Sequence, residues 1–498
     1  MKPLCRRLSG VKGIRMANKR KIALFAAGGI VALLILGMVA VVLFVDVNAH
    51  KPLLEATASD ALGMEVRIGG RLGIGLFPGF HVTLEDVRIR NRGADVASAK
   101  ETILGIELLP LLHKELRIVR IGMKRPRISI EQDREGKFNF ETPEEEAGKK
   151  TTVEAKGTRF TLDVTRISLS DGALFYADKK TGEALEAGDF TLDVSRLRFT
   201  GGKTPAPLKN LSFAAEFSCK EFRKGNLSVS NLKLRIEGKD GILDLNPVTM
   251  RLFGGQGAGR LRADLSGSVP QYHVNYSLSR FRVEEFLKTL SPKKTAEGSM
   301  DISSTLSMRG KTVDEMKRTA AGEISLRGEN LALDGVDLDR VFSRYEASQN
   351  FNLVDVSAFF FVGPFAPLVT KAYNFASIYR ETGGSSRIRT LVSDWKLERG
   401  VAQAKDVALA TNENRIALKG SLDFVNERFN DVTVAVVDEK GCAKVRQKIR
   451  GPFGDPVVEN ANVLQSVAGP MLNLLKQGRK LLGGRCEVFY AGSVASPK

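Results

Sequence analysis

Short runs of alternating hydrophobic and polar residues dominate the chain from about residue 66 onward. In the segment 160–170, FTLDVTRISLS, apolar residues alternate with polar ones, then two residues intervene and the alternation resumes one position out of phase. Alternation of this kind is typical of one face of a β-strand. A shift of one residue turns the apolar set to the other face of a sheet unless a bulge or bend absorbs it, so the segment predicts two strand segments joined by a bulge. Its apolar positions are Phe160, Leu162, Val164, Ile167 and Leu169.

Nearly the same line, FTLDVSRLRFT, returns at 190–200. Weaker copies are HVTLEDVRIRN, with Val82 and Leu84 before the slip, and ISLRGENLALDG. Repetition of one strand pattern predicts a long meander whose apolar residues extend a single surface. The apolar positions of the second copy are Phe190, Leu192, Val194, Leu197 and Phe199.

A few helices are expected between the strands. Apolar residues at helical spacing predict a helix that begins near Leu53 and ends at Gly63. No alternation of strands with long helices is visible, which argues against a parallel α/β fold. The expected fold is therefore mainly β: an N-terminal transmembrane helix, then a long antiparallel meander, which the family resemblance described below implies to be curved into a groove. The other expected elements are a hairpin at 128–140, short helices at 282–290 and 311–322, and an amphipathic helix at 461–482.

One long apolar segment stands near the N-terminus. Residues 22–45 carry no charge and follow 21 residues that hold eight Lys or Arg and no acidic residue. As a helix, this segment is about 36 Å long, enough to cross a hydrocarbon core of about 30 Å. It is too long for a cleaved signal peptide, and no small-residue cleavage site follows it. We expect an uncleaved anchor with a cytoplasmic N-terminus and the bulk of the chain outside the cytoplasm; Met1 and Met16 are both candidate starts.

These features predict seven segments along the chain. They are a cytoplasmic basic segment (1–21), the anchor (22–45), a helix with a first β segment (46–145), β-groove repeats (159–335), a helical aromatic insertion (336–387), a C-terminal β segment (388–460) and a C-terminal amphipathic helix with a tail (461–498).

The net charge of +18 taken alone suggests nucleic acid as a partner, but the positions of the charged residues argue against it. The N-terminal flank accounts for eight of these charges and leaves +10 for the rest, interspersed with Asp and Glu. A mildly basic domain beyond the membrane does not meet DNA, so no nucleic-acid partner is expected.

A search for chemistry finds no catalytic, cofactor-binding or metal-binding motif. Four histidines occur, and none lies in HExxH or near a cysteine pair; His81 and His273 fall in strand patterns. LSGSVP (265–270) and FGGQGAG (253–259) lack the context of a nucleophile elbow or a phosphate loop and are interpreted as turns. Cys442 and Cys486 are compatible with a disulfide in an oxidising compartment and equally with two reduced thiols.

The segment 358–379 is rich in aromatic residues but is interrupted by glycine, proline and lysine, which argues against a second membrane span. Two interpretations stay open: a buried helix pair, or an element that contacts lipid or closes the end of a groove. The candidate contact residues are Phe359, Phe360, Phe361 and Phe365.

The order of several weak motifs resembles the AsmA-like family of Gram-negative envelope proteins. They are a helix ending in LG, FP before LEDVRIRN, IELLPLL, the segment RPRISIEQDREGKFNF, MRLFGGQGAGRL, and LERGVAQAKDVALATNENRIALKGSLDF followed by IRGPFGDPVVE. The resemblance covers most of residues 20–460 and implies a repeating β-groove, chorein-like protein. It further implies an apolar groove that shields phospholipid acyl chains, conduction of lipid between membranes, and no catalytic residues.

Two functions fit this sequence. The first is conduction of phospholipid along an apolar groove lined by the residues of the two repeats with Val82 and Leu84, in a protein of the inner membrane and periplasm. The second is a structural or assembly factor of the envelope with a closed β core and protein partners that are unknown. The alternation of apolar residues does not distinguish these two functions, because an apolar strand face can cover either a second sheet or a lipid. A membrane-anchored hydrolase is disfavoured because the sequence holds no catalytic motif.

Overall fold

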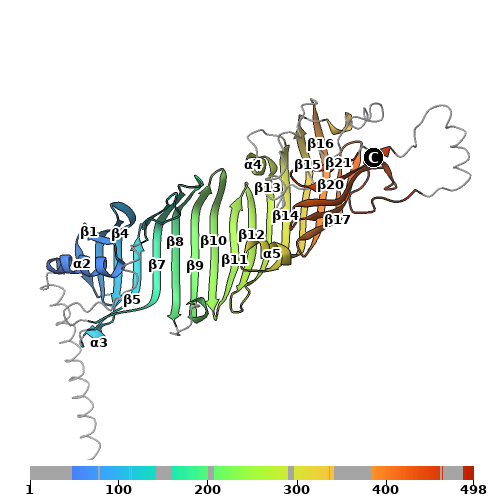
Figure 1. The fold of residues 1–498 in the computed structure, drawn as a ribbon. Coiled ribbons are helices and arrows are strands. Elements are labelled where there is room, and N and C mark those ends of the chain that lie inside the picture. The colour runs from blue at the N-terminus through green and yellow to red at the C-terminus, as the bar shows by residue number, and fades with distance from the viewer. Residues whose placement is uncertain are drawn as a thin grey trace, which may run out of the picture. The chain divides into compact units, whose positions relative to one another are not determined.

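A computed structural model describes residues 47–76, 79–111, 113, 115–141, 159–199, 207–289, 296–335, 337–340, 384–459, 462–463 and 486–497 (Figure 1). The predicted transmembrane helix at 22–45 and the four aromatic residues Phe359, Phe360, Phe361 and Phe365 lie outside these residues. Among the residues described, no helix is long and apolar enough to cross a membrane.

The chain divides into two compact units, and the first comprises the described residues up to Lys124 together with Phe140–Asp163. The predicted N-terminal helix is confirmed: it spans Lys51–Leu62 and is followed by Gly63 at φ +64°. The β-strands of the first unit form an antiparallel sheet in which β3 pairs with β1, β2 and β4. The elements are η1 (Val47–His50), α2 (Lys51–Leu62), β1 (Glu65–Ile68), β2 (Leu72–Gly75), β3 (His81–Asn91), β4 (Ala94–Ile106), α3 (Leu108–Leu111) and β5 (Glu115–Lys124).

The second unit comprises Arg125–Asn139 and the described residues from Val164 onward. From β7 to β20 each strand pairs antiparallel with the next along the chain, which confirms a mainly β meander with few short helices. The two predicted short helices are confirmed as α4 and α5. The elements are β6 (Arg127–Gln132), β7 (Arg159–Asp178, whose first five residues belong to the first unit), β8 (Ala184–Phe199), η2 (Pro207–Asn210), β9 (Leu211–Lys224), β10 (Leu227–Lys239), β11 (Ile242–Leu252), β12 (Gly255–Asp264), β13 (Gln271–Arg282), α4 (Val283–Lys288), β14 (Ala296–Arg309), α5 (Val313–Thr319), β15 (Ala321–Asp334), β16 (Ser385–Glu398), β17 (Val401–Ala410), β18 (Arg415–Asp423), β19 (Arg428–Val437), β20 (Ala443–Pro452), β21 (Val457–Val458) and β22 (Asn462–Val463).

Bulges occur where the hydrophobic alternation slips. In β8 the pairing with β9 shifts between Ser195 and Arg198, and Arg196 has φ +54°. The slips predicted in β3 and β15 coincide with Asp86 and Asn330, at φ +53° and +52°. Asp and Asn tolerate the left-handed conformation better than most side chains, so these residues absorb the slip within a continuous strand.

A further irregularity in β7 lies beyond the predicted one. The slip expected between Val164 and Ile167 precedes the residues that pair with β8 and stays a prediction, whereas the pairing with β8 is regular from Ile167 to Leu169 and breaks before Gly172. Asp171, at φ +53°, occupies the break. The two copies of the repeated line lie on adjacent antiparallel strands, where Leu169 of the first faces Leu192 of the second.

Two-residue turns that end in glycine join several of the strands. Leu252 pairs with Gly255 across Phe253 and Gly254, both at positive φ, so the expected hairpin turn exists at the start of FGGQGAG but is a tight two-residue turn, and the rest of the segment belongs to β12. Asp240–Gly241 makes the same kind of turn between β10 and β11. Such turns hold neighbouring strands in a fixed register.

The hairpin predicted at 128–140 forms only in part. The turn at Gly136 exists, with φ +90°, but the returning segment contributes a single bridge, from Phe138 to Gln132. β6 also pairs with β7, and their pairing is parallel, which departs from the expected antiparallel order. The predicted C-terminal helix is wrong at its start, because Asn462–Val463 pairs with β20; most of its length lies outside the described part of the chain.

The C-terminal strands are buried on both faces over part of their length. On one face, residues of β16–β20 such as Leu409, Ile416 and Ile449 have no exposed surface and belong to the largest buried cluster. On the other face, small side chains such as Ala408 and Ala435 are also fully buried, under Tyr490 and neighbouring residues of the segment 486–497. This end of the sheet is therefore a closed, two-sided core.

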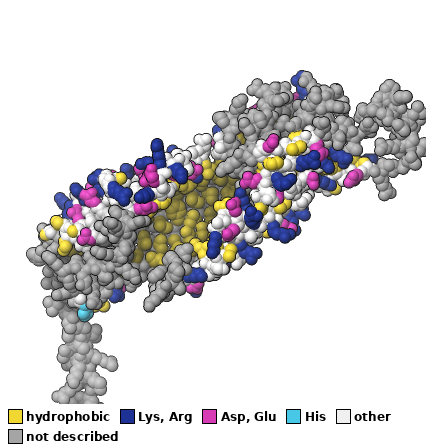
Figure 2. All heavy atoms as spheres, in the orientation of Figure 1, with side chains coloured by type: hydrophobic (Ala, Val, Ile, Leu, Met, Phe, Trp, Pro, Cys, Tyr) yellow, Lys and Arg dark blue, Asp and Glu magenta, His cyan; other side chains and the backbone are white. Residues whose placement is uncertain are grey.

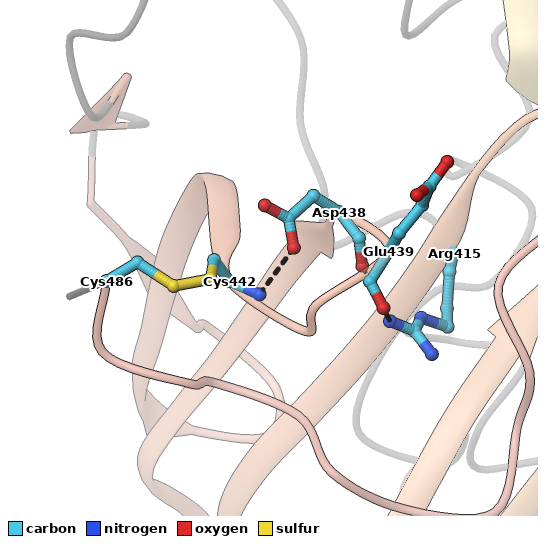
Figure 3. Close-up of a disulfide and its surroundings, with 5 residues drawn as sticks. All are labelled: Arg415, Asp438, Glu439, Cys442 and Cys486. Carbon is cyan, nitrogen blue, oxygen red and sulfur yellow. Dashed lines mark hydrogen bonds between the residues drawn. A yellow bond between two sulfur atoms is a disulfide. The ribbon is translucent and has the colours of Figure 1, made fainter. Parts of the chain in front are cut away.

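A disulfide and a set of polar contacts hold the segment 486–497, hereafter the tail, on the sheet. Cys442 and Cys486 are joined, with their Cα atoms 6.0 Å apart, which decides between the two states left open by the sequence (Figure 3). The Cys442 backbone N–H donates to Asp438 Oδ1 at 2.8 Å, and Arg415 Nη2 donates to the carbonyl oxygens of Asp438 and Glu439 at 2.6 and 3.2 Å. The covalent bond therefore closes beside a turn that is itself fixed by hydrogen bonds.

Asp406 anchors the other end of the tail. Its Oδ1 accepts from the Tyr490 hydroxyl at 2.6 Å and its Oδ2 from the Ser493 backbone N–H at 2.9 Å, while Arg415 Nη1 donates to the Val494 carbonyl at 3.0 Å. Burial alone would raise the pKa of Asp406, but the hydrogen bonds from Ser493 and Tyr490 and the charge of Arg327 outweigh it and lower the pKa below its usual value. The same burial, with the hydrogen bond to Asp406, raises the pKa of Tyr490. Asp406 is therefore ionised at neutral pH.

Removal of the disulfide should loosen the tail. In the chain-entropy account, a link across 44 residues stabilises the folded state by about 4 kcal/mol. We expect the paired change Cys442→Ser and Cys486→Ser to lower the unfolding temperature and to speed amide exchange at 488–494. Cys219→Ala is the matched control, because Cys219 is a free thiol. Equal unfolding temperatures for the oxidised protein and the double variant would contradict the assignment.

Asp406→Asn should destabilise the tail in a pH-dependent way. Loss of a charged hydrogen-bond acceptor costs about 1.5–3 kcal/mol at neutral pH. Because the folded pKa lies below the unfolded value of about 3.9, the stabilisation is full above that value and disappears as the pH falls through the folded pKa. The gap in unfolding temperature between wild type and variant should therefore be constant from pH 8 to about pH 5 and shrink below about pH 4. Asp189→Asn, at an exposed ion pair, should show no such gap.

Candidate functional site: an open apolar face

Paired residues on adjacent antiparallel strands lie on the same face of a sheet, so the pairing of the second unit identifies continuous rows. Two rows run side by side from β7 to β16, and we call the surface that they form the apolar face. The first row is Leu169, Leu192, Phe217, Leu234, Val248, Gly259, Tyr276, Ser304, Ile324 and Trp395. The second is Ile167, Val194, Ala215, Ile236, Leu245, Leu261, Val274, Leu306, Gly322 and Leu397.

No residue of the two rows carries a charge, while the opposite face carries many. Asp193, Glu216 and Arg235 form one outer row, in which Arg235 Nη2 lies 2.8 Å from Glu216 Oε1. Both members of this ion pair are exposed, so the pair adds little to stability. The strands thus separate an apolar side from a charged, hydrated side.

The apolar face is hollowed. Figure 2 shows a concave hydrophobic surface over the strands drawn in green in Figure 1, bordered by Lys, Arg, Asp and Glu side chains. On β9, inward residues run from Phe213 to Phe222, a distance of about 30 Å at 3.3 Å per residue. The eight strands β7–β14 extend about 34 Å in the other direction at 4.8 Å per strand.

Side chains of this surface are only partly covered. Leu192, Leu234, Val248 and Leu261 are all half-buried, although they lie in the middle of a sheet. A large apolar area left in contact with water is unfavourable by about 25 cal/mol per Å², so the surface favours an apolar ligand.

Several predicted lining residues lie together on the apolar face. Ile167, Leu169, Leu192 and Val194 are two facing pairs of β7 and β8. Phe190 lies beside them and is 5% exposed; its ring stacks on Phe217 with the centroids 6.2 Å apart. Leu197 is half-buried next to the bulge of β8.

Other predicted lining residues lie elsewhere. Val82 and Leu84 are half-buried in β3 of the first unit, where they face Ile74 and Leu72. Val164 is half-buried near the start of the second unit. The side chains of Phe160, Leu162 and Phe199 are outside those that the structure describes.

Most of the apolar face was not singled out from the sequence. Leu234 and Ile236 in LKLRI, and Val274 and Tyr276 in HVNYS, obey the same alternation as the repeated line. A search for the alternation itself, instead of for copies of one line, would have found them.

The two rows of the apolar face contain two polar side chains, Tyr276 and Ser304. The Tyr276 hydroxyl is buried without a hydrogen-bond partner, and burial raises its pKa. Within the described ranges, no group of three His, Cys, Asp or Glu side chains is placed to hold a metal ion. The arrangement can shield an apolar ligand.

Comparison with known proteins identifies the family. The model of the AsmA family matches residues 16–206 and 210–407. Neither the curated proteins nor the solved structures that were compared give a match. Because the family model covers well over half of the sequence, as the order of its motifs suggested, the chain belongs to the AsmA family.

Proposed function

We propose that this protein shields phospholipid acyl chains on its apolar face and moves them within the bacterial envelope, in support of outer-membrane assembly. The observation that carries the proposal is the half-buried apolar face on β7–β14, backed by a charged face on the same strands. Its dimensions of about 30 by 34 Å exceed one leaflet of the hydrocarbon core, which is about 15 Å, so both chains of a phospholipid fit.

The proposed location is the inner membrane, with the second unit in the periplasm. The charge-free segment 22–45 and its basic flank support a single-pass anchor with a cytoplasmic N-terminus. The Cys442–Cys486 disulfide supports an oxidising compartment for the C-terminal part. The proposed role is binding and transport without chemical conversion of the lipid.

A second candidate is a structural or assembly factor that binds envelope proteins. It is favoured by the closed core of β16–β20, where both faces of the sheet are covered and no apolar ligand is required. The two candidates differ in what touches β7–β14.

Photo-crosslinking in Gram-negative cells that make the full chain separates them. A photoreactive residue at Leu192 faces the apolar side, and one at the adjacent Asp193 faces the charged side. We expect phospholipid adducts at Leu192 and none at Asp193. Protein adducts at both positions without lipid would favour the assembly factor, and equal lipid adducts at both would contradict a single protected face.

A charge placed on the apolar face should expel the lipid. On the scale for a charged residue in hydrocarbon, Leu234→Glu costs about 3 kcal/mol of lipid binding, or roughly 100-fold in occupancy. Lipid adducts at a photoreactive Val248, which faces Leu234, should fall accordingly. The control is Lys233→Glu, at the neighbouring exposed position on the charged face, which should leave the adducts unchanged. Unfolding temperatures of both variants establish that the fold is kept.

A further inference from the structure

The burial of the side chains on the apolar face changes abruptly along the two rows. From β7 to β14 the row residues are half-buried, with only Ala215 fully buried. At β15 and β16 the same rows continue with Ile324, Trp395 and Leu397, which are 4%, 2% and 6% exposed. The second row then runs on through Ala402, Leu422 and Phe429, at 0%, 0% and 4%. One continuous face is thus open at one end and closed at the other.

Helix α4 contributes to the closure. It follows β13 and buries Phe286 and Leu287, while Phe286 packs edge-on against Phe253, with the ring centroids 5.4 Å apart. Phe281, 2% exposed, packs against both rings, with centroid distances of 6.5 Å to Phe253 and 6.3 Å to Phe286. These aromatic side chains lie where the half-buried part of the face meets the buried cluster.

Beyond this point most described inward side chains belong to one buried cluster. A single cluster joins inward residues of β13–β15 and α4 to those of β16–β20, and Phe424, Phe429 and Phe453 pack together within it. The Trp395 indole N–H donates to Ser393 Oγ at 2.7 Å inside the core. An acyl chain that continued along the rows would displace several fully buried side chains, each worth about 1.5–3 kcal/mol of burial. Burial of the acyl chain there would not offset the burial that the displaced side chains lose.

We propose that the apolar face is a blind groove: acyl chains occupy it along β7–β14 and stop before Trp395. This rests on the function proposed above and adds a route to it. Lipid enters and leaves through the open part on β7–β14, and it does not pass along β16–β20 to the C-terminal end. A membrane or protein that receives the lipid must therefore engage β7–β14, and the closed end serves as a structural stop.

The sequence holds a single tryptophan, and it is Trp395, so its fluorescence reports on the closed end. The full chain is reconstituted in vesicles of phospholipid with brominated acyl chains, which quench tryptophan on contact, and in vesicles of the ordinary lipid. The wild-type protein is compared with Trp395→Phe carrying Leu192→Trp or Leu234→Trp, which place the reporter on the open part. Trp395→Phe with Lys233→Trp, on the charged face, controls for contact with the bilayer itself.

We expect loss of emission in brominated lipid at Leu192→Trp and Leu234→Trp, and none for wild type or for Lys233→Trp. Quenching of the wild-type protein would overturn the blind groove while leaving lipid binding intact. Absence of quenching at all four positions would overturn the proposed lipid function and the groove with it. The wild-type measurement needs no substitution, so the closed end is tested even if a variant does not fold.

Discussion

Register between antiparallel strands is the constraint on which this structure depends. A strand turns successive side chains to opposite faces, so the apolar face exists only if every strand from β7 to β16 enters with the same parity. Tight turns such as Asp240–Gly241 and Phe253–Gly254 set that parity from strand to strand. Where the sequence slips by one residue, a bulge restores it, as at Arg196 and Asn330. Because side chains alternate along each strand, the polar residues between the apolar ones then lie on the opposite face.

Burial distinguishes two regions of the same meander. On β7–β14 the sheet has one hydrated face and one apolar face that is only partly covered, which is unfavourable in water and becomes favourable when an apolar ligand is present. On β16–β20 the inner face closes on itself and the outer face is covered by the tail, so Ala408 and Ala435 are as buried as Ile416. A stable core at one end makes an exposed apolar surface at the other end tolerable for the whole unit.

The sequence predicted the strands and their faces well because alternation and phase slips are local. Leu192 and Val194 were placed on one face with Ile167 and Leu169, as their pairing has it. The irregularity of β7 at Asp171 was not predicted, because that residue lies outside the repeated line.

Burial was not predictable from the same pattern. Leu234 in LKLRI and Trp395 in SDWKL alternate alike, yet one is half-buried and the other 2% exposed, since the difference arises from strands far away in sequence. The runs DVALA and VTVAVV were a readable signal that was missed, because unbroken apolar runs are typical of strands buried on both faces.

The two-residue turns have a consequence for how the protein comes apart. Strands joined this closely contact mainly their sequence neighbours, so the open sheet behaves as a chain of nearest-neighbour units, as in repeat proteins. Local separation of one hairpin there exposes two new edges but transmits little strain to strands further away. The buried C-terminal core, by contrast, packs residues from Leu278 to Phe453 into one cluster, and we expect it to unfold cooperatively. The second unit therefore combines a sheet that can open locally, one hairpin at a time, with a C-terminal core that holds together.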